Sequence, residues 1–218
     1  MPTPFDQSTY QVRLDWGTDG LARLAPADIV VVIDVLRFSS TVADAVAAGA
    51  SVALGGALGW SRNGAAVAAA AGDAIVLVGG IRNATAVATA ITTLQERRQA
   101  RTSVAVIAAG EADADGVLRF AVEDHLGAGA VIDALTSRGI DHTAPDAAVA
   151  AEGFRALRRA LRHMISASGS AREIAEGVPA TDRMSEAGVT PTTAAAAAEI
   201  DALDVVPVLR DGEFVAFD

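Results

Sequence analysis

The chain has 218 residues, 51% of them hydrophobic but only 4% aromatic, and a formal net charge of −10 at pH 7. This acidic balance argues against a nucleic-acid partner, because phosphate backbones are bound by clustered Lys and Arg. No cysteine is present, which excludes disulfides and thiolate chemistry. We also expect no signal peptide and no membrane partner, and therefore a soluble cytoplasmic protein, because Asp, Arg or Gly interrupts the apolar runs.

The length is compatible with a single α/β domain over residues 1–218. Residues 10–16 alternate apolar and polar side chains, which is typical of a half-buried strand, and residues 17–20 are expected to turn the chain. Residues 29–33 are five successive β-branched residues, which indicates a strand buried on both faces. A helix is expected after this strand, ending near Gly49, with Ser39 or a neighbouring hydroxyl as its cap.

The same pattern of an apolar strand and a capped helix recurs twice. Residues 74–78 and 103–108 read as further buried strands, each followed by a helix. Between the first two units we expect a short strand at 50–54, a loop through residues 55–64 and a short helix at 65–71. Three such units predict a parallel sheet with the turns after its strands at one edge.

The remaining chain is expected to add helices and a hairpin. Residues 145–165 read as one long helix with an arginine-rich face, which we interpret as a solvated face. Residues 166–170 read as a hinge or loop. Asp211-Gly212 lies between two apolar runs in residues 205–215 and predicts a C-terminal hairpin. We therefore expect a three-layer α/β/α fold with a largely parallel sheet.

Four carboxylates are predicted to gather at the edge where the strands end. Asp34 directly follows the most apolar strand, and open α/β sheets bind ligands at that end. Glu111, Glu123 and Asp124 follow the third strand, and adjacent residues on a helix diverge so that at most one of the last two points inward. Carboxylates of this kind suit Mg²⁺, although each can instead cap a helix or solvate the surface. The acidic loop with Asp113 and Asp115 is interpreted as a solvated surface.

Three side chains are candidate donors to an anionic ligand. The forks of Arg37 and Arg82 match phosphate or sulfonate oxygens, and Asn83 adds a neutral amide. Either arginine can equally pair with one of the carboxylates. No dinucleotide fingerprint, phosphate-binding P-loop or nucleophile elbow is present.

Several stretches in sequence order resemble the signature of one family, the 2-phosphosulfolactate phosphatases. They are residues 33–42 (IDVLRFSSTV), 79–88 (GGIRNATAVA), 108–111 (AAGE), 120–131 (FAVEDHLGAGAV), 166–169 (SASG) and 204–212 (DVVPVLRDG). The resemblance covers about residues 28–215. The segment from Gly55 to Asn63 is shorter than its counterpart in the family, and Asn63 keeps part of an Asn-Gly-Thr turn.

The resemblance implies a Mg²⁺-dependent phosphoric monoester hydrolase on an α/β/α fold, acting on a small anionic phosphorylated substrate. It implies catalytic, substrate-binding and metal-binding roles for a defined set of residues. The catalytic residues are Asp34, Arg37 and Glu111, the substrate-binding residues are Ser39, Ser40, Asn63, Arg82 and Asn83, and the metal ligands are Asp34, Glu123 and Asp124. Asp34 is left as either nucleophile or metal ligand.

Two alternatives remain open at this point. The first is a phosphatase that hydrolyses a 2-phosphosulfolactate-like monoester. The second is a weakened family member that binds a phosphorylated metabolite without turnover. The sequence also leaves the oligomeric state open, with a homo-oligomer among the alternatives.

Overall fold

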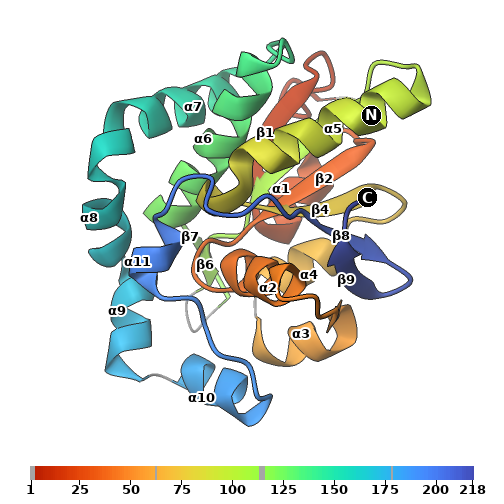
Figure 1. The fold of residues 1–218 in the computed structure, drawn as a ribbon. Coiled ribbons are helices and arrows are strands. Elements are labelled where there is room, and N and C mark those ends of the chain that lie inside the picture. Colours follow the sequence, from red (N-terminus) through yellow and green to blue (C-terminus); the bar gives the residue numbers. More distant parts are fainter. Residues whose placement is uncertain (1–2, 62, 113–115, 178) are drawn as a thin grey trace.

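The computed structural model describes residues 3–61, 63–112, 116–177 and 179–218, and its chain folds around one main sheet (Figure 1). The seven strands of this sheet lie in the order β1-β5-β2-β4-β8-β9-β3. Their bounds are β1 Val12–Trp16, β2 Ile29–Ile33, β3 Val52–Ala53, β4 Ile75–Gly79, β5 Val104–Ala108, β8 Pro207–Arg210 and β9 Glu213–Ala216. A separate small hairpin pairs β6 Glu111–Ala112 with β7 Leu118–Arg119.

Four neighbouring strands of the sheet, β1, β5, β2 and β4, run parallel. In the centre, Val31 of β2 lies opposite Leu77 of β4 on one side and Val106 of β5 on the other. The C-terminal hairpin of β8 and β9 continues the sheet in antiparallel pairing. The predicted fold class, with a largely parallel sheet and a C-terminal hairpin, is confirmed.

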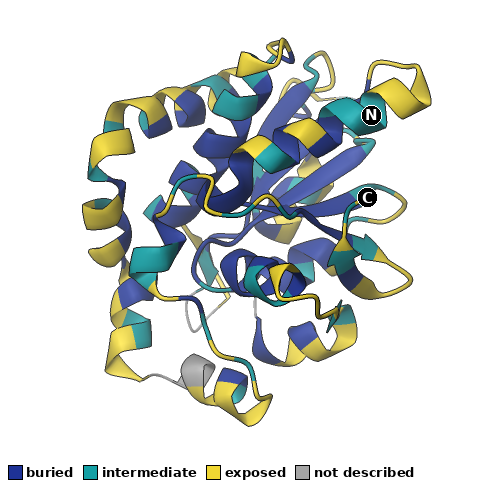
Figure 2. Ribbon diagram, in the orientation of Figure 1, coloured by how far each residue is buried: buried dark blue, intermediate teal, exposed yellow. Residues whose placement is uncertain are grey.

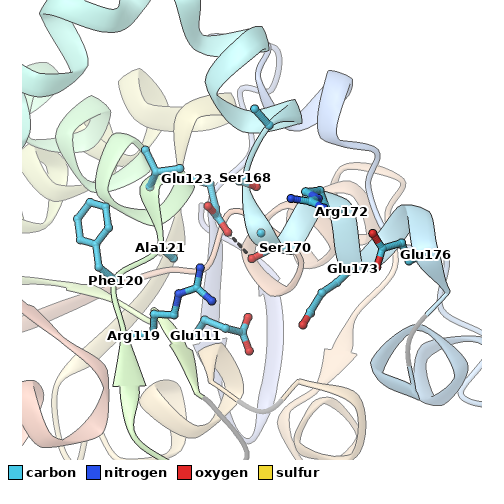
Figure 3. A pocket seen from close by; sticks show the side chains of 13 residues that line it. Glu111, Arg119, Phe120, Ala121, Glu123, Ser168, Ser170, Arg172, Glu173 and Glu176 are labelled. Atoms are coloured by element: carbon cyan, nitrogen blue, oxygen red, sulfur yellow. Dashed lines mark hydrogen bonds between the residues drawn. The ribbon is translucent and has the colours of Figure 1, made fainter.

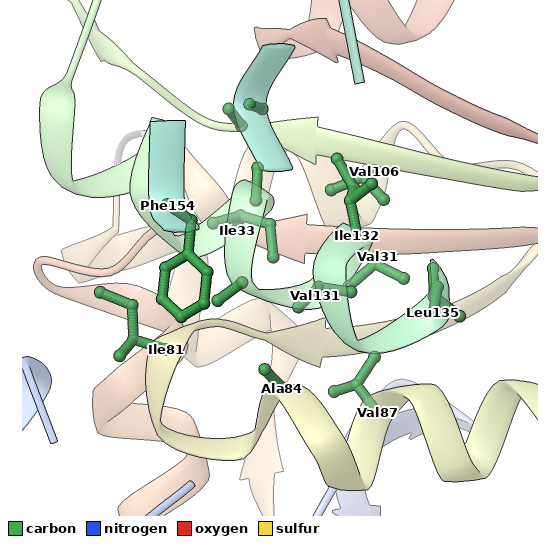
Figure 4. Packing of buried hydrophobic residues seen from close by; sticks show 14 of the residues in the cluster. Val31, Ile33, Ile81, Ala84, Val87, Val106, Val131, Ile132, Leu135 and Phe154 are labelled. Carbon is green, nitrogen blue, oxygen red and sulfur yellow. The ribbon is translucent and has the colours of Figure 1, made fainter. Parts of the chain in front are cut away.

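Helices cover both faces of the sheet, and successive residues of β2 point into opposite cores. Val31 and Ile33 pack into a core with α5 Ala84–Arg98, α6 Val122–Ser137 and α7 Pro145–Leu157 (Figure 4). Val30 and Val32 pack into the second core. The helices of that second layer are α2 Phe38–Ala47, α3 Leu54–Trp60 and α4 Gly64–Ala69, with α1 Gly17–Arg23 beside them. The strands therefore appear continuously buried in Figure 2, as their unbroken apolar sequence predicts.

The C-terminal part of the chain forms shorter helices along one side of the molecule (Figure 1). They are η2 Arg158–Ala160, α8 Leu161–Ser166, α9 Gly169–Glu176, α10 Pro179–Glu186 and α11 Ala194–Ala197. A further short helix, η1 Ile81–Asn83, lies between β4 and α5. The single helix predicted over 145–165 is instead divided into α7, η2 and α8. The hinge predicted at 166–170 contains Ser168, whose hydroxyl accepts the N–H of Ala171 and caps α9.

Two predicted loops are helices in the structure. Residues 17–20, expected to turn the chain, begin α1, where Gly17 and Gly20 are buried. Much of the loop expected over 55–64 is α3, which buries Ala57 and Trp60 against the second core. Burial of one face of each helix outweighs the low helix propensity of its glycines, because tertiary packing supplies most of a helix's stability.

Candidate active site

The ends of β2, β4 and β5 meet at one edge of the sheet, as predicted from the three strand–helix units. Asp34 follows β2 and Glu111 lies just past β5. The parallel register aligns Ile33 of β2 with Gly79 of β4 and Ala108 of β5, so the turns that leave these strands start at the same level. This is the position where parallel α/β sheets present ligand-binding residues.

Asp34 is 8% exposed and is held by backbone amides on both of its carboxylate oxygens. Oδ1 accepts the N–H of Phe38 at 3.1 Å, and Oδ2 accepts the N–H of Gly64 at 3.0 Å. The first contact satisfies an N–H at the start of α2 and the second an N–H at the start of α4. Asp34 therefore fixes the starts of two helices around the end of β2.

Asp124 connects two of the strand-end turns. Its Oδ1 accepts the N–H of Val35 at 2.7 Å, and its Oδ2 accepts the N–H of Gly110 at 2.9 Å. The side chain is 3% exposed. Asp124 therefore holds the start of α6 against the turns after β2 and β5.

Glu123 is also buried, at 2% exposed, so the expectation that only one of Glu123 and Asp124 points inward is wrong. Asp124 faces the strand ends, whereas Glu123 faces α9 and accepts a hydrogen bond from the Ser170 hydroxyl (Figure 3). The two side chains diverge as expected for helix neighbours, but the start of α6 is enclosed on both of these sides. The prediction considered only the sheet as a packing partner.

An open cleft of about 520 Å³ lies between the β6–β7 hairpin, the start of α6 and α9. Glu111 and Arg119 project from the hairpin into this cleft, and Glu123 projects from α6 (Figure 3). The opposite wall is formed by Ser168, the N-cap residue of α9, and by the helix itself, which contributes Ser170, Arg172, Glu173 and Glu176. The cleft is lined by four glutamates and two arginines and is therefore strongly polar.

Burial and mutual repulsion raise the pKa values of three carboxylates at this edge. Burial raises the pKa of Asp34 to about 6. The hydrogen bonds from its two backbone amides and the positive charge of Arg37 lower this pKa and so offset part of the effect of burial. The pKa of Glu111 is raised to about 7 by burial and by the charges of Glu173 and Asp34. Burial, with Asp34 and Glu123 nearby, also holds the pKa of Asp124 well above its usual range. Two groups of the edge thus titrate near neutral pH, as is common in active sites.

Arg37 is the basic residue closest in sequence to Asp34, and it lies at the N-cap position of α2. The peptide bond that precedes it is cis. Its positive charge lowers the pKa values of both Asp34 and Glu111, so it lies within electrostatic reach of both carboxylates. The structure therefore brings together the three residues predicted to be catalytic.

The hydroxyls of Ser39 and Ser40 are directed to the backbone. Ser39 Oγ donates to the carbonyl of Val32 at 3.1 Å and accepts the N–H of Asp34 at 2.9 Å. Ser40 Oγ donates to the carbonyl of Val35 at 2.8 Å. Both serines are buried and stabilise the turn between β2 and α2. Their predicted contact with substrate stays a prediction.

The other predicted donors also contact protein groups. Arg82 forms an ion pair with Asp44 of α2. Asn83 donates to the carbonyls of Val78 and Val205, and Asn63 donates to the carbonyl of Gly110 at 2.8 Å. Of these three, Asn63 contacts the turn that leads to Glu111 and so lies at the candidate site. Substrate contacts of Arg82 and Asn83 stay predictions as well.

The predicted metal ligands do not form a ready cation site. In the part of the chain that the structure describes, no group of three His, Cys, Asp or Glu residues is arranged to hold a metal ion. Asp34 and Asp124 bind backbone amides at the strand ends, whereas Glu123 faces α9 and accepts a hydrogen bond from Ser170. The residues as arranged therefore do not fit a three-carboxylate Mg²⁺ site. Asp113 and Asp115 lie outside the described residues.

Several residues of the site were not identified from the sequence. Gly64 and Gly110 contribute through their backbone N–H groups, which no side-chain pattern reveals. Ser170 and Arg172 belong to a segment read as a hinge and its continuation, and Arg119 lies in a two-residue strand. The serine-rich stretch at 166–170 was the available signal, since Ser168 is a favoured helix cap.

The parallel sheet, with an acidic cleft at the ends of its central strands, defines an α/β protein with a small-ligand site at the sheet edge. A family model described as "2-phosphosulpholactate phosphatase" matches residues 60–212. This is well over half of the chain, which therefore belongs to that family. The predicted family is confirmed, and membership supports a phosphatase-type hydrolase. No match was found among curated proteins.

The matched range includes Glu111, Glu123 and the whole of α9, and it begins after α2. The similarity noted at residues 33–42 therefore lies outside it. None of the described helices is long and apolar enough to cross a membrane.

Proposed function

We propose that the chain hydrolyses a small anionic phosphate monoester, with 2-phosphosulfolactate as the model substrate, at the edge formed by Asp34, Arg37 and Glu111. The observation that carries this proposal is the pair of carboxylates at the strand ends, Asp34 and the cleft-lining Glu111, which lie within electrostatic reach of each other and have pKa values of about 6 and about 7. Two carboxyl groups with separated pKa values near the working pH are suited to act as base and acid. Family membership supports the choice of phosphoryl chemistry.

In the proposed reaction, Asp34 is the base and Glu111 is the acid. A water oxygen attacks phosphorus while Asp34 accepts a proton from that water. The bond between phosphorus and the ester oxygen breaks, and Glu111 gives its proton to the departing alcohol oxygen. Arg37 stabilises the negative charge on the phosphoryl oxygens, for which its planar fork is suited. The products are an alcohol and inorganic phosphate.

Mg²⁺ dependence stays a prediction, and no step of the proposed reaction uses the ion. The carboxylate chemistry of the edge suits a hard cation, but the described residues are not arranged around a common position for one. Turnover measured with added Mg²⁺ and with EDTA tests the dependence directly.

The proposed function is tested by the pH dependence of kcat/KM for a phosphate monoester. We expect activity to rise as Asp34 loses its proton near pH 6 and to fall as Glu111 loses its proton near pH 7. Replacing Glu111 by Gln is expected to lower kcat by about a hundredfold or more and to remove the falling limb, because a positioned acid contributes ~10²–10⁴ in rate.

Glu176→Gln is the matched control, because Glu176 is a more exposed carboxylate at the same cleft. It should keep both limbs of the wild-type profile. A pH-independent rate between pH 5 and 8, or full turnover by Glu111→Gln, would contradict the assigned roles. Ligand-induced thermal stabilisation without turnover would favour the metabolite-binding alternative.

A further inference from the structure

Glu111 is joined to β5 through Gly110, which we call the Gly110 joint. Ala109 still pairs with the sheet, since its N–H donates to the carbonyl of Ile33 at 2.7 Å. Gly110 follows with a φ of +67°, in the left-handed region that residues with a side chain rarely adopt. Because glycine has wide conformational freedom, the joint by itself does not fix the direction in which Glu111 leaves the strand.

The hairpin that carries Glu111 packs closely on this joint. A Cβ on Gly110 would lie 2.9 Å from the carbonyl oxygen of Arg119 and 2.9 Å from Cδ1 of Leu118. A stiffer residue therefore does not fit in place of the glycine. Contacts from other elements are needed to hold the joint in one conformation.

Two side chains hold the two peptide groups on either side of the joint. The N–H of Gly110, in the peptide group that precedes its Cα, donates to Asp124 Oδ2 at 2.9 Å. The carbonyl of Gly110, in the peptide group that leads to Glu111, accepts Nδ2 of Asn63 at 2.8 Å. Peptide groups are planar, so their relative orientation depends only on φ and ψ of the glycine. Holding both groups therefore fixes both torsions and, with them, the point from which Glu111 projects.

The same two side chains are connected to the turn that carries Asp34. Asn63 directly precedes Gly64, whose N–H donates to Asp34 Oδ2 at 3.0 Å. Asp124 also accepts the N–H of Val35, which directly follows Asp34, at 2.7 Å. The joint is thereby linked to the Asp34 turn by two separate routes.

We propose that Asn63 is a positioning residue, whose amide holds the Gly110 joint so that the carboxyl group of Glu111 stays in the cleft beside the Asp34 turn. This inference rests on the proposed function, because the position of Glu111 affects turnover only if Glu111 takes part in it. It differs from the substrate contact that the family resemblance implies for Asn63, since the amide donates to a protein carbonyl. Asp124 makes the companion contact but also holds α6, so Asn63 is the better residue to replace.

The test removes the amide of Asn63 and measures kcat and KM for 2-phosphosulfolactate across pH. Asn63→Ala and Asn63→Leu both lack the donor, and Leu keeps most of the side-chain volume. We expect both to lower kcat by about tenfold to about a hundredfold, because a displacement of about 1 Å costs up to ~10² in rate, while KM stays within about threefold. The falling limb of the pH profile should move to lower pH, since a displaced Glu111 loses part of the burial that raises its pKa.

Gln11→Ala is the matched control. Gln11 Nε2 donates to the carbonyl of Thr102 at 3.0 Å, so it is also a side-chain amide that holds the backbone beside β5, but at the opposite end of the strand. This variant should keep the kcat, KM and pH profile of wild type. An equal loss of kcat in Gln11→Ala and Asn63→Ala would indicate general loosening of β5 and overturn the proposal, as would wild-type kcat in either Asn63 variant.

A double variant tests whether Asn63 acts through Glu111. In a Glu111→Gln background, adding Asn63→Ala should change kcat by no more than about twofold, because the group that Asn63 positions is already absent. A further loss as large as that seen in wild type would mean that Asn63 acts independently of Glu111. A rise in KM at unchanged kcat would mean that Asn63 contacts the substrate. Either result overturns the proposal.

A titration of Glu111 separates this proposal from the proposed function without any turnover. The carbon-13 signal of its carboxyl group is assigned by its loss in Glu111→Gln. We expect a pKa of about 7 in wild type and Gln11→Ala, and a lower pKa in Asn63→Ala. If wild type hydrolyses no monoester but this pattern holds, the hydrolytic function is wrong and the positioning role stands. If wild type hydrolyses esters while Asn63→Ala keeps its kcat and the pKa of Glu111, the positioning role is wrong.

Discussion

Replacing Asp34 by Asn should change stability in a way that depends on pH. The folded protein raises the pKa of Asp34 from 3.8 to about 6, chiefly because the carboxylate is buried. At about 1.36 kcal/mol per pKa unit, ionised Asp34 costs the folded state about 3 kcal/mol. The cost is small at pH 4, develops as pH rises toward 6 and is complete at pH 8. Asn has no such cost at any pH.

The same replacement also removes an acceptor. The Asn amide has one oxygen, so one of the N–H groups of Phe38 and Gly64 loses its acceptor, at a cost of about 1–3 kcal/mol. That cost does not vary with pH. The free energy of unfolding of Asp34→Asn, relative to wild type, should therefore increase by about 2–3 kcal/mol between pH 4 and pH 8.

Urea unfolding at several pH values, with EDTA present to remove bound cations, measures this difference. Asp73→Asn, at an exposed position, is the control and should show a much smaller change with pH. The reasoning is refuted if the relative stability of Asp34→Asn is constant across this range, or if it decreases as pH rises. Either result would mean that the folded protein does not disfavour the ionised carboxylate.

Two glycine replacements should separate damage to the site from damage to the fold. A Cβ on Gly64 would lie 2.6 Å from Asp34 Oδ2 and 2.6 Å from the ring of Phe38. Gly64→Ala should therefore displace Asp34 and lower kcat/KM at least about tenfold in activity assays. It should also lower the free energy of unfolding, measured in urea, by about 1–3 kcal/mol. Unchanged kinetics would contradict this placement of Asp34. A Cβ on Gly129 would lie 2.1 Å from the carbonyl oxygen of Ala150, where α6 and α7 pack. Gly129→Ala should therefore lower Tm, with a loss of about 2–3 kcal/mol in the free energy of unfolding. The protein that remains folded should keep the wild-type kcat and KM. A Tm equal to that of wild type would show that the helices separate readily.

The central strands were predictable because their sequences allow few other structures. Continuous runs such as 29–33 and 104–108 are too short and too rich in β-branched residues for helices, and both are fully buried strands. The helices α1 and α3 were missed because they contain glycines, which disfavour helix locally. What forms them is burial of residues such as Trp60 against distant parts of the chain, and local propensity carries no information about that.

The candidate site was predictable only where it follows from strand order. Asp34 and Glu111 come from positions at strand ends, and a parallel sheet brings such positions together regardless of loop details. Arg172 and Ser170 reach the cleft only because α7 and α8 return the chain to the sheet edge. Nothing local in the sequence specifies that return.

The carboxylate of Asp124 has a consequence for the order in which the site can form. It is the shared acceptor for the N–H groups of Val35 and Gly110, residues that are 75 positions apart in the chain. During synthesis β2 and β5 emerge before α6, so both turns lack this acceptor until α6 docks. Opening of α6 then exposes both amides at once. Hydrogen exchange at these two turns would accordingly report a single event, the undocking of α6 from the sheet edge.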